Sequence, residues 1–101
     1  MPERIVVFWR DIPAQIIVQA GRRRAKRELA KRFIEAIDMT AMRVGARDTD
    51  AYLADWRKGD GEPCGDDLEA EADKAAAAVE AEYDDARLKS LVASGGYDER
   101  K

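Results

Sequence analysis

Residues 4–19 read RIVVFWRDIPAQIIVQ, and this stretch decides the fold that the sequence predicts. It holds seven of the chain's twelve isoleucine and valine residues, whereas alanine is the commonest apolar residue in the rest of the chain. We interpret it as two strands, Arg4–Trp9 and Gln15–Gln19, with a connection at residues 11–14 between them. Pro13 belongs to the connection because proline cannot donate a hydrogen bond to a sheet ladder. The rest of the chain is expected to pack on this hairpin.

The first predicted strand is apolar on both faces, since residues 5–9 are Ile, Val, Val, Phe and Trp without alternation. Strands of this kind are usually covered on both sides. Two arrangements satisfy that requirement. The helices that follow divide between the two faces, or they share one face and the other face is an interface.

A long helix is predicted over residues 22–44. Within it Leu29, Phe33, Ile37 and Ala41 recur at the four-residue spacing of one helix face. This apolar stripe is expected to lie against the sheet.

A second helix is predicted over residues 67–93, after a glycine-containing loop at residues 58–66. A break near Asp84 is expected, because the apolar stripe changes phase there and Asp is a good helix N-cap. We expect a single domain over residues 1–95 and a flexible tail at residues 96–101.

Residues 48–57 fit two structures. Tyr52, Leu53 and Trp56 have the spacing of a helix face, whereas Tyr52, Ala54 and Trp56 fit one face of a strand. We favour the strand, because a hairpin alone is marginally stable in water and a third strand makes a viable sheet. The resulting fold class is α+β with two layers, an antiparallel three-stranded sheet packed with two helices in the order ββαβα.

The chain has no histidine and one cysteine, Cys64. This composition excludes Ser-His-Asp and Cys-His nucleophile systems, the usual zinc sets and an internal disulfide. An acid–base enzyme would depend on carboxylates such as those of Asp11 or Asp55. We therefore predict no catalytic site, no metal site and no cofactor, and we interpret Cys64 as an exposed loop thiol.

The sequence also predicts a cytoplasmic protein without a membrane role. No apolar run approaches the roughly 20 residues that a helix needs to span a bilayer. The N-terminus leads directly into a strand pattern rather than a signal peptide. A single cysteine fits a reducing compartment.

Charge is distributed unevenly along a chain whose net charge is −3. Residues 1–58 carry 13 Lys and Arg against 8 Asp and Glu, and residues 59–101 carry 5 against 13. Either the two halves attract each other within the fold, or one charged surface selects a charged partner.

Arg22, Arg23 and Arg24 stand where the first helix is predicted to begin. Arginine beside the free N–H groups of a helix start makes an anion site, which would take a phosphate or the carboxylates of a partner. The alternatives are a solvated helix start or ion pairs with the acidic second helix. Nucleic-acid binding is not expected, because the acidic second half would repel a phosphate backbone.

A contact surface for a protein partner is predicted around the connection of the hairpin. Trp and Arg are frequent anchors of interfaces, although Trp9, Tyr52 and Trp56 fit a core role equally well. The candidate partner-binding residues are Trp9, Arg10, Asp11, Pro13, Tyr52 and Trp56.

Five short motifs carry a resemblance to a known family. They are WRDIPAQI at residues 9–16, RAKR at 24–27, RF at 32–33, AID at 36–38 and YLADWR at 52–57. With them, residues 4–93 resemble the small "virulence factor" domain family. A related region of the conserved virulence factor C proteins is joined to HEAT-type helical repeats, which this sequence does not contain.

The resemblance implies an accessory protein, in the context of corrinoid- and folate-dependent methyl-transfer systems. We therefore expect a non-catalytic interaction module that binds a methyltransferase or corrinoid-protein component, or a second copy of itself. The alternative is a protein that binds a small anionic ligand or a phosphate-bearing cofactor at Arg22–Arg24.

Overall fold

The hairpin predicted at residues 4–19 lies at the centre of the sheet. In the computed structural model, which describes residues 2–45 and 50–97, β1 (Glu3–Trp9) pairs antiparallel with β2 (Ile12–Ala20). The register shifts between Val7 and Phe8, so that Phe8 stands opposite Pro13. Pro13 therefore lies within β2 rather than in the connection, because an irregularity in the ladder leaves room for a residue that cannot donate.

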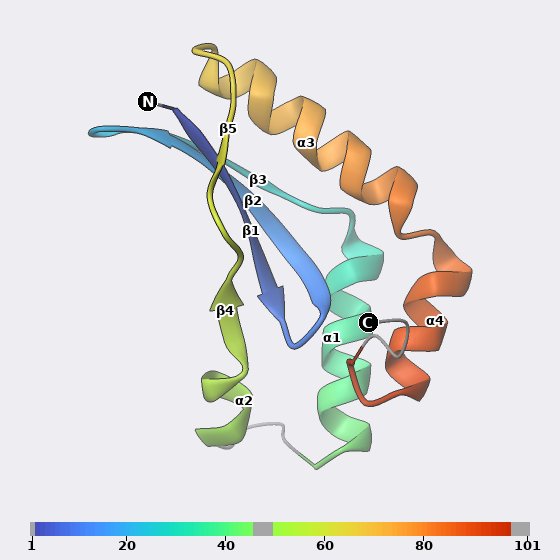
Figure 1. Cartoon of the computed structure of the whole chain (residues 1–101). Helices are drawn as coiled ribbons and strands as arrows, with labels where there is room; N and C mark the ends of the chain where they lie inside the picture. Colours follow the sequence, from blue (N-terminus) through green and yellow to red (C-terminus); the bar gives the residue numbers. More distant parts are fainter. Residues whose placement is uncertain (1, 46–49, 98–101) are drawn as a thin grey trace.

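The sheet is larger than predicted. Its strand order is β3-β2-β1-β4, and the short β5 also pairs with β1 (Figure 1). The fold is α+β, as expected, but the described residues form five strands and four helices rather than the order ββαβα. After β2 the elements are β3 (Arg23–Glu28), α1 (Lys31–Arg43), α2 (Asp50–Ala54), β4 (Trp56–Lys58), β5 (Glu62–Pro63), α3 (Leu68–Glu82) and α4 (Asp85–Ala93).

The prediction of a helix from Arg22 is wrong, because the chain continues as strand β3 and α1 begins only at Lys31. Gly21 adopts a φ of +60°, which glycine tolerates and which turns the chain back along β2. Ala25 is buried between exposed basic neighbours, the alternation that is typical of a strand with one covered face. Phe33 is therefore the first residue of the predicted apolar stripe that lies within the helix.

Both interpretations of residues 48–57 are partly correct. Residues 50–54 form the helix α2, and Trp56 begins β4, which pairs with β1 from Trp9↔Trp56 to Val7↔Lys58. Tyr52 and Trp56 thus belong to different elements and do not share a strand face. Residues 48 and 49 lie outside the described part of the chain.

The break predicted in the second helix is confirmed, since α3 ends at Glu82 and α4 begins at Asp85. The carboxylate of Asp84 accepts a hydrogen bond from the Arg87 amide at 2.8 Å, and Asp67 caps α3 in the same way. Each cap satisfies an amide that the helix leaves without a partner.

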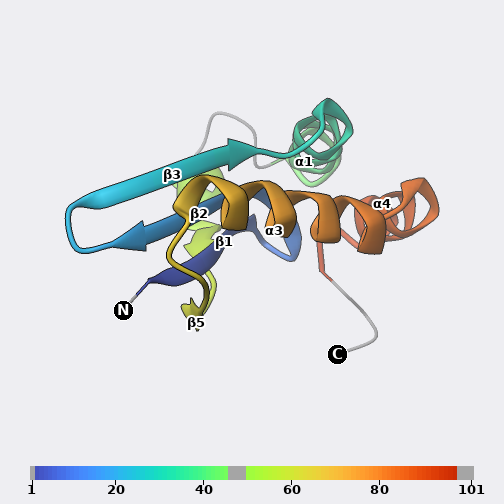
Figure 2. The same ribbon diagram turned by 90° about the horizontal axis from the view of Figure 1, so that it is seen from above.

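The helices do not take one face of the sheet each. Figure 2 shows α3 lying along the sheet, where it packs mainly on β2 and β3. The helices α1 and α4 pack side by side near the turn between β1 and β2. On the opposite face Ile5, Val7 and Ile17 form a small buried cluster, which Trp56 borders. The helices α1, α3 and α4 thus share one face of the sheet, and an interface on the opposite face stays a prediction.

Candidate protein-interaction surface

The predicted contact residues at the hairpin corner are buried or partly buried in the fold. Trp9 and Pro13 are fully buried, so they are core residues and not part of an accessible surface. The Trp9 Nε1–H donates to the carbonyl of Tyr52 at 2.9 Å, and the two rings lie 5.7 Å apart. Trp56 meets the Tyr52 ring edge-on. The sequence grouped these aromatic residues correctly, but they hold α2 and β4 against β1.

Arg10 joins three distant segments of the chain. Its Nε donates to the Asp55 carboxylate at 2.9 Å, and its Nη1 donates to the carbonyl of Gly95 at 2.6 Å. The guanidinium lies between the rings of Trp9 and Tyr97, 4.9 and 5.0 Å from their centroids. Charge-assisted hydrogen bonds and stacking of this kind suit arginine in particular.

Asp11 completes the same corner. Its carboxylate forms an ion pair with Arg57 Nη2 at 3.0 Å, and its backbone amide donates to the carbonyl of Gly96 at 2.8 Å. We call Arg10, Asp11, Asp55 and Arg57 the corner network. The carboxylates that an acid–base enzyme would need, those of Asp11 and Asp55, are both held by arginine in this network.

Arg22, Arg23 and Arg24 lie elsewhere than predicted, on the turn and first half of β3 rather than at a helix start. This placement overturns the anion site that was expected from helix N–H groups. Arg23, Arg24 and Lys26 are exposed on the outermost strand of the sheet, and Arg22 is exposed on the turn that precedes it. We call these four residues the basic edge. Within the described residues, none of the ion pairs involves them.

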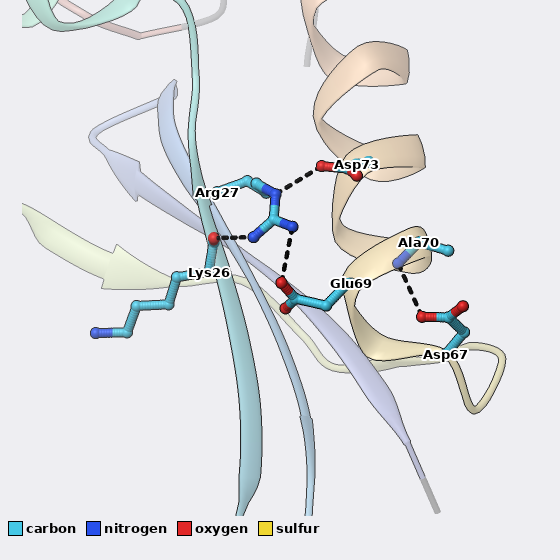
Figure 3. A network of polar contacts seen from close by, with 6 residues as sticks. All are labelled: Lys26, Arg27, Asp67, Glu69, Ala70 and Asp73. Carbon is cyan, nitrogen blue, oxygen red and sulfur yellow. Dashed lines mark hydrogen bonds and ion pairs between the residues drawn. The ribbon is translucent and has the colours of Figure 1, made fainter.

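Arg27 on the same strand behaves differently (Figure 3). Its Nε donates to Asp73 at 2.6 Å and its Nη2 to Glu69 at 3.0 Å, both on α3. These hydrogen bonds, above all the one that Arg27 donates to Asp73, raise the pKa of Arg27 above its ordinary value. The predicted attraction between the basic and acidic halves is therefore present at Arg27. The charges of the basic edge, in contrast, remain exposed to solvent.

A hollow lies between α3 and the β1–β4 side of the sheet, with a volume of about 440 Å³. It exists because α3 covers β2 and β3 but contacts β1 only slightly. Val6 and Phe8 form its floor and Ala75 and Ala78 part of its helical wall. Arg57, at its rim, is engaged in the corner network.

Cys64 is half-buried in the loop before α3 rather than fully exposed. Burial, and then the nearby carboxylate of Glu71, raise the pKa of its thiol. In the described part of the chain, no group of His, Cys, Asp and Glu side chains has the arrangement of a metal site. No helix there has the length and apolar character needed to cross a membrane.

Sequence reasoning missed two features of this surface. The strand character of the basic edge had a local signal, the alternation around Ala25 after a glycine. The bond from Arg10 to Gly95 had none, because it joins residues at opposite ends of the chain.

Comparison with protein families agrees with the resemblance that the sequence shows. The family model described as "Virulence factor" matches residues 7–92, which include the corner network and the basic edge. No curated protein and no solved structure matches the chain. The chain belongs to the virulence factor family.

Proposed function

We propose that this protein is a non-catalytic interaction module, and that it docks onto an acidic segment of a partner protein through the basic edge. One observation carries the proposal. Four basic side chains are exposed on the outermost strand and the turn before it, and none of them joins an ion pair within the described residues. Like charges within a cluster repel one another, so binding an oppositely charged segment of a partner lowers the electrostatic free energy of the cluster.

The state of the carboxylates supports a role in binding rather than in catalysis. Asp11 and Asp55 are held by Arg57 and Arg10 at 3.0 and 2.9 Å. A general base must be within reach of a substrate proton. Because these carboxylates are held in ion pairs at a corner of the fold, we assign them a structural role.

The acidic helix α3 favours a protein over a nucleic acid as the partner. Glu69 and Asp73 stand on α3 beside β3, and they are exposed. A continuous phosphate backbone would meet these carboxylates as well as the basic edge. A short acidic segment can touch the basic residues alone.

The resemblance to accessory proteins suggests which partners to test first. These are the corrinoid-protein and methyltransferase components of methyl-transfer systems. We expect the purified protein to bind one of them with an affinity that falls with rising salt, because exposed charges are screened. Replacing all four residues of the basic edge by Gln should abolish the binding.

The matched control replaces Lys74 and Lys89, which are exposed on α3 and α4, by Gln. This control should bind as the wild type does. Equal binding by the basic-edge variant and the wild type would contradict the proposal, as would the absence of binding to every component tested.

A second candidate function rests on the hollow beside α3. Its volume, about 440 Å³, falls in the range of small-molecule sites. Thermal-shift screening with corrinoids, folates and nucleotides tests it, since a ligand at 100 times its Kd stabilises by about 2.7 kcal/mol. Ala78→Leu, which fills the wall of the hollow, should remove the shift. No shift with any of these compounds would count against this function.

A further inference from the structure

The basic edge offers backbone groups as well as charge. β3 pairs with β2 from Ala20↔Arg23 to Gln15↔Glu28, and it ends the sheet on that side. Alternate N–H and C=O groups of an edge strand point away from the sheet and can pair with another strand. Figure 2 shows β3 at the margin of the sheet, with α3 over its face and α1 beyond its end.

The two faces of β3 present different surroundings. Ala25 is buried and Arg27 is bonded to α3, so these residues face the helix. Successive side chains of a strand alternate between its faces, which places Arg24 and Lys26 on the open face, where both are exposed.

We infer that the partner segment binds in an extended conformation and adds a strand to β3, with Asp or Glu at alternate positions. This inference rests on the proposed function and specifies its ligand. The acidic side chains lie on the open face beside Arg24 and Lys26, because cross-strand neighbours of opposite charge stabilise a sheet. β3 has six residues, enough for a partner strand of about 20 Å.

The residues between the acidic positions are uncharged. They face the helix side of the sheet, where Glu69 and Asp73 already surround Arg27 at 3.0 and 2.6 Å. A further carboxylate next to Arg27 would be repelled by these two groups, which already pair with its guanidinium.

A second copy of this chain does not fit the same edge. Pairing β3 with β3 would bring arginine and lysine side chains of both strands next to each other, and like charges opposite one another destabilise a sheet. The basic residues thus prevent self-association through the edge and at the same time select an acidic strand.

The first test uses two fluorescent peptides of equal composition, Glu-Thr-Glu-Thr-Glu-Thr and Glu-Glu-Glu-Thr-Thr-Thr, with fluorescence anisotropy as the measurement. Strand addition predicts that the alternating peptide binds about tenfold or more tightly than the block peptide. Arg24→Gln with Lys26→Gln should weaken it by about three- to tenfold, as expected for two exposed ion pairs. The control Lys74→Gln with Lys89→Gln should not change it.

The second test asks whether the backbone takes part. Alternate N–H groups of a strand point to opposite edges, so N-methylation of the three Glu residues and of the three Thr residues blocks opposite edges. Strand addition predicts that one methylated peptide loses binding and the other retains it.

The outcomes separate the inference from the proposed function. If both methylated peptides bind, or both fail, strand addition is wrong, while the proposed acidic partner stands as long as binding still depends on the basic edge. If neither parent peptide binds but a single-stranded oligonucleotide of equal charge does, both the inference and the proposed function are wrong.

Discussion

Arg10 shows how one residue can hold a small domain together. It occupies a positive φ of 54°, which is uncommon for a residue other than glycine. That conformation turns the chain between β1 and β2 and directs the guanidinium to Asp55 and the carbonyl of Gly95. The side chains of Arg10 and Asp55 are only 14% and 26% exposed, so the pair is screened less than a surface salt bridge.

Replacing Arg10 by Met keeps much of the packing and removes the charge. The Asp55 carboxylate and the Gly95 carbonyl then lose their donor, and we expect the free energy of unfolding to fall by about 2–4 kcal/mol. Urea denaturation of the variant measures the loss. Arg22→Met, at an exposed arginine, is the control and should change stability by less than about 0.5 kcal/mol. Equal effects of the two changes would refute the role of Arg10.

Cys64 should react slowly with alkylating reagents. Its raised pKa lowers the fraction of the reactive thiolate, so iodoacetamide at pH 8 should modify it more slowly than a cysteine in a short peptide. Glu71→Gln removes the second cause of the shift and should speed the reaction. Because the pKa of the Cys64 thiol is higher in the folded than in the unfolded protein, the neutral thiol contributes stability that is fully present below the unfolded pKa. This contribution is lost as pH rises through the folded pKa. A reaction as fast as that of the peptide would disprove the raised pKa.

At the scale of the element, the sequence predicts structure where the signal is local. The β1–β2 hairpin and the break at Asp84 follow from apolar runs and a cap. The strand β3 was predicted as a helix because Leu29 continues the spacing of Phe33 and Ile37 toward the N-terminus, while the turn at Gly21 decides otherwise. The sequence singled out Arg22, Arg23 and Arg24 but predicted them at a helix start, whereas Arg23 and Arg24 lie on β3 and Arg22 lies on the turn before it.

The cap at Asp84 makes the break between α3 and α4 testable. Asp84→Ala removes the hydrogen bond to the Arg87 amide and should reduce the free energy of unfolding by about 0.5–2 kcal/mol. Asp85→Ala is the control, because this neighbouring carboxylate lies 3.8 Å from Arg32 and is exposed, so its loss should cost less. Thermal or urea unfolding compares them, and a larger loss for Asp85→Ala would contradict the capping role.

At the scale of the whole molecule, the chain is closed by contacts between its first hairpin and the residues after its last helix. The amides of Asp11 and Gly96 illustrate this closure, since Asp11 donates to the Gly96 carbonyl and Gly96 itself donates back to Leu91 at the end of α4. A domain of this size buries a modest share of its surface, so fastening its two ends together contributes an appreciable part of a small total stability.

Gly96 provides the test of this closure. Its φ is +90°, and a Cβ placed there would lie 2.9 Å from Arg10 Cδ and 3.3 Å from Thr40 Cγ2. Gly96→Ala therefore combines backbone strain with displacement of Arg10, and we expect a loss of about 2–4 kcal/mol in urea unfolding. Gly21→Ala shares the positive φ, +60°, but its Cβ would meet no atom within 4 Å, so it reports the backbone cost alone, about 1 kcal/mol.

Because only Gly96→Ala disturbs the corner network, it should lose more stability than Gly21→Ala. Combining Gly96→Ala with Arg10→Met should cost less than the sum of the two single changes. Additive losses would mean that the end of the chain and the corner network stabilise the domain independently.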